Sequence, residues 1–88
     1  MSSKMNRHME LLMEILADEE ALLADEFEDA LIGYLRGPNI VAVYDYNLCI
    51  HILMEDNMTY EQAMEYMEYN VVNAYVGEKS PIFISVFS

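Results

Sequence analysis

The chain has 88 residues, of which 16 are acidic and 4 are lysine or arginine, so its formal charge at neutral pH is −12. Such a charge disfavours direct binding to nucleic acid and to anionic membrane surfaces, whose phosphates would repel it. The length predicts one domain over residues 1–88. No apolar run approaches the roughly 18 residues of a membrane span, and residues 1–8 lack a secretory pattern, so we expect a cytoplasmic protein.

The amount of apolar sequence points to self-association. Apolar residues make up 55% of the chain, above the usual share of about 45–50%. A domain of this size buries a small core, and Cys49 is the only cysteine, so no disulfide can form within the chain. We therefore expect a homodimer or a larger oligomer.

Two helices are predicted in the N-terminal part. Apolar residues recur at helical spacing within residues 4–17, which predicts an amphipathic helix. A second helix is predicted over residues 26–35, with Asp25 as its N-cap and Glu28 in the capping-box position. Gly37-Pro38 would end this helix, because proline cannot continue one.

A strand and a third helix follow. Ile40–Tyr44 is a short β-branched run, which predicts a strand that is central or covered on both faces. Asp45 can cap a helix from Tyr46 to about Met54. Cys49 falls on the apolar stripe of this helix, where we expect it to be a core residue.

A fourth helix and a second strand complete the predicted order. Thr59 and Gln62 form a capping box at the start of a helix whose apolar face continues to Ala74. Pro81 precedes an apolar run, Ile82–Phe87, which predicts a strand. The expected fold is therefore α+β, with four helices and a two-stranded sheet in the order α-α-β-α-α-β. The two strands would pair with each other or with a second subunit.

Acidic residues concentrate near the N-terminus. Nine of them lie between Glu10 and Asp29, with no lysine or arginine among them. Such a stretch can be a negative surface that docks on a basic host protein, or a mimic of nucleic-acid charge. It can equally be a solvated face that only keeps the chain soluble.

Candidate binding residues lie at the ends of the predicted strands and along the last helix. Asp45 and Glu78 flank the strands, where functional groups often collect, although Asp45 is also simply explained as a cap. The last helix carries a mixed polar and aromatic stripe, with tyrosines that suit either an interface or the rim of the core. The candidates are Asp45, Tyr66, Glu68, Asn70, Asn73, Tyr75 and Glu78.

Motifs of metal and catalytic chemistry are missing from the sequence. His8, His51 and Cys49 do not match a zinc spacing. The sequence has no D-x-D-x-D-G loop, HExxH motif, nucleophile elbow or glycine-rich phosphate loop. We therefore predict no catalytic residue, no metal and no cofactor.

From Phe27 onward the chain resembles a family of small uncharacterised proteins encoded by tailed bacteriophages. The similarity covers roughly the last two thirds of the sequence. It is carried by the segments Phe27–Tyr34, Val43–Tyr46, Ile52–Glu55, Met58–Ala63, Tyr66–Asn70 and Ala74–Pro81. The resemblance implies a phage origin and action in the host cytoplasm, and it implies no named activity.

Three functions are compatible with the sequence. The leading hypothesis is a non-enzymatic phage protein that acts by protein–protein contact, through its last helix or its acidic N-terminal part. An acidic nucleic-acid mimic that inhibits a host DNA-binding protein is the first alternative. The second is a small carboxylate- or metal-dependent hydrolase that would use Asp45, Glu68, Asn70 and Glu78.

Overall fold

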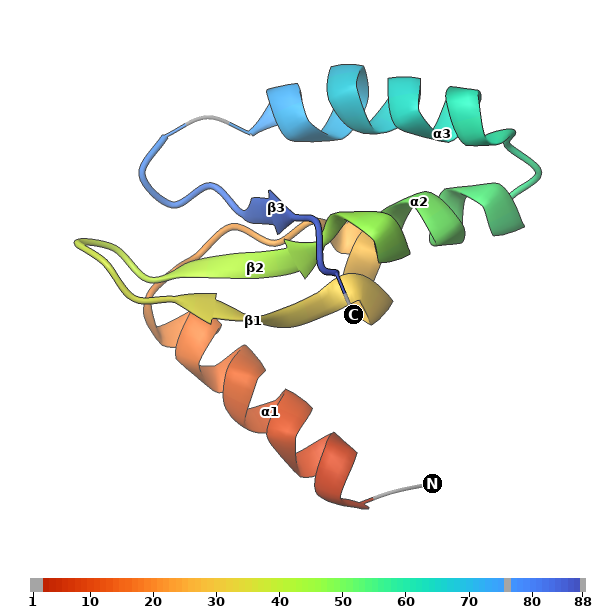
Figure 1. The fold of residues 1–88 in the computed structure, drawn as a ribbon. Coiled ribbons are helices and arrows are strands. Elements are labelled where there is room, and N and C mark those ends of the chain that lie inside the picture. The colour runs from red at the N-terminus through yellow and green to blue at the C-terminus, as the bar shows by residue number, and fades with distance from the viewer. Residues whose placement is uncertain (1–2, 76, 88) are drawn as a thin grey trace.

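A computed structural model describes residues 3–75 and 77–87 as an α+β fold (Figure 1). Its sheet has the strand order β1-β2-β3, with β1 antiparallel and β3 parallel to β2. The α+β class is confirmed, whereas the expected two-stranded sheet and the expected order of elements are wrong. The elements are α1 (Ser3–Asp18), the 3-10 helix η1 (Asp25–Ala30), β1 (Leu31–Leu35), β2 (Val41–Asp45), α2 (Tyr46–Glu55), α3 (Tyr60–Tyr66), the π-helical turn η2 (Met67–Val71), the 3-10 turn η3 (Val72–Ala74) and β3 (Ile82–Ile84).

The predicted second helix is the main error. Residues 31–35 form the edge strand β1, in which Tyr34 pairs with Ala42 and Leu35 with Val41. The 3-10 helix η1 precedes it, and Ala24 stands before η1 without a side-chain cap, so Asp25 is not the N-cap that the sequence indicates. Residues 36–40 connect an antiparallel hairpin instead of ending a helix. Pairing with β2 thus overrides the local helical spacing.

Strands β2 and β3 occupy the positions expected for the two predicted strands. β2 is the middle strand, as the sequence indicates, and it pairs with β3 within the chain. β3 is shorter than the predicted Ile82–Phe87, and its last pair is Ile84 with Asp45. β2 ends at Asp45, where the chain turns into α2, so a longer β3 would have no partner.

The last helical segment confirms its predicted start and adds an irregular end. The Thr59 hydroxyl accepts from the Gln62 N–H at 3.1 Å, and the Gln62 side chain accepts from the Thr59 N–H at 2.9 Å. After Tyr66 the helix widens into η2, where the Val72 N–H donates to the Met67 carbonyl, and it closes with η3. The helical segment therefore reaches Ala74, as predicted, through a π turn that the sequence did not indicate.

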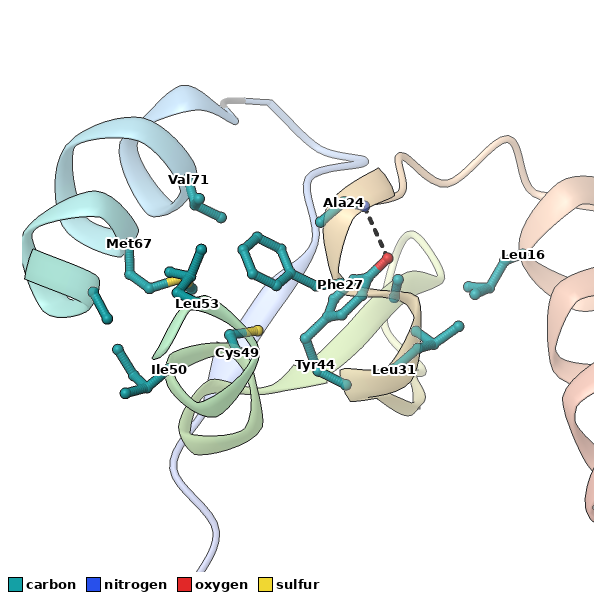
Figure 2. Close-up of a cluster of buried hydrophobic side chains, with 13 residues drawn as sticks. Leu16, Ala24, Phe27, Leu31, Tyr44, Cys49, Ile50, Leu53, Met67 and Val71 are labelled. Carbon is teal, nitrogen blue, oxygen red and sulfur yellow. Dashed lines mark hydrogen bonds between the residues drawn. The ribbon is translucent and has the colours of Figure 1, made fainter. Parts of the chain in front are cut away.

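The hydrophobic core lies between one face of the sheet and the helices (Figure 2). Its largest fully buried side chains are Tyr44, Phe27, Leu16, Met67 and Cys49. The position of Cys49 in the core is as predicted. Among residues 7–18 of α1, whose burial the structure describes, Leu16 is the one that is fully buried, so this part of α1 is held to the rest of the fold mainly by the end that leads into residues 19–24.

Tyr44 joins the sheet to the segment between α1 and η1. Its ring stacks on that of Phe83 in the neighbouring strand, with centroids 5.4 Å apart. Its hydroxyl accepts a hydrogen bond from the Ala24 backbone N–H at 2.8 Å (Figure 2). Ala24 lies in an irregular stretch and is itself buried, so this bond satisfies a donor that neither a helix nor the sheet satisfies.

We expect Tyr44→Phe to lower the free energy of unfolding by about 1–3 kcal/mol, because the buried Ala24 N–H loses its acceptor. Urea denaturation measures the change. The matched control is Tyr34→Phe, because the Tyr34 hydroxyl accepts only an exposed bond from Arg36 at 3.3 Å. Its effect should stay within about 0.5 kcal/mol. Equal losses in the two variants would contradict the role given to Tyr44.

Candidate functional site

Asp45 serves as the N-cap of α2. Its carboxylate accepts from the backbone N–H groups of Asn47 at 2.9 Å and Leu48 at 3.2 Å. These bonds satisfy donors that the first turn of a helix leaves free. The structure thus confirms the predicted cap, and it gives this carboxylate a local structural task.

Tyr66 and Tyr75 hold the segment that precedes and begins η1. The Tyr66 hydroxyl donates to the Glu26 carboxylate, at 2.9 and 3.1 Å from its two oxygens. The Tyr75 hydroxyl donates to the Leu23 carbonyl at 3.3 Å. Both rings are half-buried. Of the two expectations for these tyrosines, the rim of the core describes Tyr66 and Tyr75.

Lys79 fastens the same segment from the loop before β3. Its backbone carbonyl accepts from the Leu22 N–H at 3.1 Å, and its ammonium group donates to the Glu19 carbonyl. Together with the bonds from Tyr44, Tyr66 and Tyr75, this contact ties residues 19–26 to the sheet and to the last helical segment. We call residues 19–26 the clamped segment.

Of the remaining candidates, Glu68 and Asn73 line one hollow, while Asn70 and Glu78 lie elsewhere. Glu68 accepts a bond from the Tyr46 hydroxyl at 3.3 Å. Glu78 accepts from the Asn39 side chain at 3.3 Å, beside the hairpin connection. Asn70 and Asn73 are exposed on the last helical segment, where they line separate shallow hollows.

The candidate carboxylates do not come together as a metal site. Within residues 3–75 and 77–87, no three His, Cys, Asp or Glu side chains converge as ligands of a metal ion. Asp45, Glu68 and Glu78 instead have different hydrogen-bonding partners on different elements. The arrangement needed for the hydrolase hypothesis is therefore not seen in the described part of the chain.

The chemistry of the histidines and the cysteine also fits a structural interpretation. His8 and His51 are exposed. Cys49 is fully buried, and burial raises the pKa of its thiol to about 12. The nearby Asp45 carboxylate is a smaller cause of the same rise. At neutral pH the thiol is protonated, so Cys49 is a poor nucleophile.

The structure contains a cleft that the sequence did not indicate. It lies between α1 and the clamped segment, with a volume of about 240 Å³. Buried apolar residues, Ala24, Leu31 and Tyr44, form its floor, and three of its lining residues are exposed carboxylates. The lining residues are Met9, Met13, Leu23, Ala24, Asp25, Glu28, Asp29, Leu31 and Tyr44. The acidic run from Glu10 to Asp29 was the one sequence feature that pointed to this cleft. Its apolar floor could not be predicted, because it depends on packing that brings Leu31 and Tyr44 under α1.

Comparisons with protein-family models, with curated proteins and with solved structures find no match to this chain. No helix in the described residues is long and apolar enough to cross a membrane. The cleft and the clamped segment therefore have to be interpreted from their own chemistry.

The cap at Asp45 can be tested separately from the negative charge of its carboxylate. We expect Asp45→Ala to lower the free energy of unfolding by about 1 kcal/mol, because two N–H groups of α2 lose their acceptor. Asp45→Asn should retain most of the stability, since asparagine also caps helices well. Chemical denaturation of both variants checks this. If Asn were as destabilising as Ala, the negative charge and not the cap would be what matters.

The raised pKa values of the tyrosines that make these contacts lead us to expect a loss of stability at high pH. The pKa of Tyr66 is raised mainly by its hydrogen bond to the Glu26 carboxylate, and those of Tyr44, Tyr46 and Tyr75 mainly by burial. Each therefore deprotonates first in the unfolded chain, near the usual pKa of about 10. Their contribution is complete below that pH and is lost as the pH rises through the folded-state values.

We expect the urea concentration at the midpoint of unfolding to decrease as the pH rises above about 10, in parallel with phenolate absorbance. Tyr66→Phe should reduce this fall, because it removes one of the groups with a raised pKa. The control is Tyr69→Phe, whose ring is 75% exposed. A urea midpoint that did not change over this range would contradict the assignment.

Proposed function

We propose that this chain is a non-enzymatic protein that acts through protein–protein contacts. The cleft between α1 and the clamped segment is its contact surface, and the partner presents a basic, amphipathic segment. The observation that carries the proposal is the combination of an apolar floor with three carboxylates in one hollow. The resemblance to tailed-phage proteins supports a partner in the bacterial host.

The size and lining of the cleft favour side chains of a protein as its occupants. Its volume of about 240 Å³ is below the roughly 300–1,000 Å³ of small-molecule sites. Met9 and Met13 are 39% and 37% exposed along its edge. Methionine adapts its shape to different apolar groups and is common at surfaces that accept amphipathic helices.

The charge around the cleft favours a basic partner. Asp25, Glu28 and Asp29 are exposed at its edge. Further carboxylates continue the negative surface along α1, at Glu10, Glu14 and Asp18, all exposed. Complementary charge mainly raises the rate of association and selects the partner, while the apolar floor supplies affinity.

The last helical segment is less suited to be the main contact surface. The hydroxyls of Tyr66 and Tyr75 already donate to the clamped segment. A partner that accepts a hydrogen bond from either hydroxyl would have to break its present bond. The hollows beside Asn70 and Asn73 are wide and open to solvent, and they offer little buried surface.

A nucleic-acid mimic is the second candidate, and the same exposed carboxylates favour it. Glu10, Glu14 and Asp18 follow one another at intervals of four residues on α1. This spacing places charges about 6 Å apart along the helix. A mimic needs only the carboxylates, whereas the first proposal also needs the apolar floor. Removing the floor therefore separates the two.

A synthetic amphipathic helical peptide of leucine and lysine is a suitable probe. We expect it to bind, and to bind less tightly between about 0.05 M and about 0.5 M salt. Glu28→Gln with Asp29→Asn should weaken binding about fivefold at low salt, as two partly exposed charge pairs are lost. Titration calorimetry measures both effects.

The matched control is Glu61→Gln with Glu65→Gln, which removes the same charge from the exposed face of α3. If the control weakened binding as much, attraction would be general and not centred on the cleft. Met9→Gln with Met13→Gln separates the two candidates. A loss of binding supports the cleft, and unchanged binding supports the mimic.

A further inference from the structure

α1 is attached to the rest of the fold near one end. Leu16, in its last turn, is 1% exposed, whereas Met9 and Leu11 near its middle are 39% and 52% exposed. Figure 1 shows α1 running away from the sheet, with its beginning apart from the other labelled elements. An element with so few buried contacts can open while the rest of a domain stays folded.

Hollows lie on two sides of α1. Met13 lines the cleft beside the clamped segment, and Ile15 lines a second hollow that α1 shares with β1. The apolar side chains of α1 therefore pack only partly against the rest of the fold. Because α1 is one wall of the cleft, a movement of α1 relative to the floor would change the width of the cleft.

α1 ends in a strained turn. The Glu20 N–H donates to the Ala17 carbonyl, and the Ala21 N–H donates to the Leu16 carbonyl, each at 3.0 Å. This pair of bonds is the Schellman motif, which places one residue in the left-handed region and usually has glycine there. Here that residue is Glu20, with a φ of 57°. A side chain makes this conformation costly, so the turn weakens the attachment of α1.

Charge weakens the same turn. Asp18, Glu19 and Glu20 crowd the end of α1, where the helix dipole already disfavours negative charge, and the last turn of α1 has no basic residue. The ammonium group of Lys79 donates to the Glu19 carbonyl and supplies a compensating positive charge from the loop before β3. The position of α1 therefore depends on a contact made by another part of the chain.

The chain beyond this turn is fixed. Backbone groups of residues 22–24 are hydrogen-bonded to the loop before β3, to Tyr75 and to β2. A movement of α1 would therefore be absorbed at residues 19–21, which we call the hinge. Hinges are commonly a few residues at the end of an element, where the backbone angles can change.

We propose that α1 is a hinged lid over the cleft, which opens in the free chain and closes on the partner. Its role in binding rests on the proposed function. An apolar side chain of the partner would enter between the floor and the two methionines, Met9 and Met13, and would supply the packing that α1 lacks. Basic groups of the partner would also offset the negative charge of α1. Binding would therefore hold α1 in its closed position.

Hydrogen exchange in the free full chain tests the opening. A helix of 16 residues is only marginally stable when isolated in water, so an open lid exposes its amides to exchange. We expect the amides of Leu11–Ile15 to be protected about tenfold less than those of Leu22 and Ala24. They should share one protection factor, because the lid opens as a unit. Equal protection of the lid and the clamped segment would overturn the proposal, and so would protection that rises steadily toward Ile15, which indicates fraying.

Relief of the strained turn tests the position of the hinge. Glu20→Gly removes the cost of the left-handed conformation, so the amides of α1 should become about fivefold better protected. The matched control is Asn57→Gly, because Asn57 has a φ of 72° in the turn between α2 and α3. It should leave the protection of α1 unchanged. An equal rise in both variants, or none in Glu20→Gly, would contradict a hinge at Glu20.

Removal of the Lys79 ammonium group tests the contact that holds the lid. In Lys79→Met the end of α1 loses a compensating charge, so its amides should be protected about threefold less. The control is Arg36→Met, which removes the same charge from the hairpin connection, where Arg36 lies over the ring of Tyr34. A similar loss of protection in both variants would contradict the role given to Lys79.

Binding of the leucine–lysine peptide tests the closure. At a free peptide concentration about ten times its Kd, the amides of Leu11–Ile15 should become about tenfold better protected, so that their protection approaches that of the Ala24 amide. Tight binding with α1 still exchanging as in the free chain would overturn the lid and leave the contact surface intact. If calorimetry detects no binding, the contact surface fails, and exchange in the free chain still decides whether α1 opens as a lid.

Discussion

The hydrogen bond from the Ala24 N–H to the Tyr44 hydroxyl is the contact on which the arrangement of this small fold depends. Residues 21–24 belong to neither a helix nor a strand, yet Ala24 is buried. A buried N–H without a partner costs about 1–3 kcal/mol, a large part of the stability of a small domain. The middle strand supplies the acceptor through a side chain, and so fixes an irregular segment against the sheet.

Further hydrogen bonds from distant residues hold the same segment. Tyr75 and Tyr66 donate to Leu23 and Glu26, and Lys79 bonds the segment at Glu19 and Leu22. Consequently the clamped segment forms a fixed wall beside α1. That wall carries Asp25 and, with η1, presents carboxylates beside apolar groups. The tyrosines thus hold the clamped segment in place, and we do not expect their hydroxyls to contact the partner.

Local chemistry explains which parts of the fold were predictable from the sequence. The caps at Asp45 and Thr59 involve residues two or three positions apart, and both were predicted correctly. Residues 31–35 were predicted as the end of a helix because Asp25 and Glu28 resemble a capping box and Gly37-Pro38 resembles a helix stop. Only pairing with Val41–Tyr44 across the hairpin makes them a strand. The spacing of residues in the sequence does not show whether a local helix or pairing with a distant strand is more stable.

The candidate site was harder to predict, because its parts come from distant positions. The bonds that form the clamped segment join residues 20, 40 and 52 positions apart. Tyrosine-rich sequence indicated a core rim or an interface, but it could not identify the partner of each hydroxyl. The nine acidic residues were visible in the sequence. Their position beside an apolar floor follows from the packing of Tyr44 and Leu31.

Hydrogen exchange at the Ala24 amide tests most directly whether a tyrosine hydroxyl fixes this segment. If it does, the Ala24 N–H should exchange only through global unfolding, with protection similar to that of the β2 amides. In Tyr44→Phe its protection should fall by more than that of β2. Exchange of the wild-type Ala24 amide at the rate of an exposed loop would contradict the account.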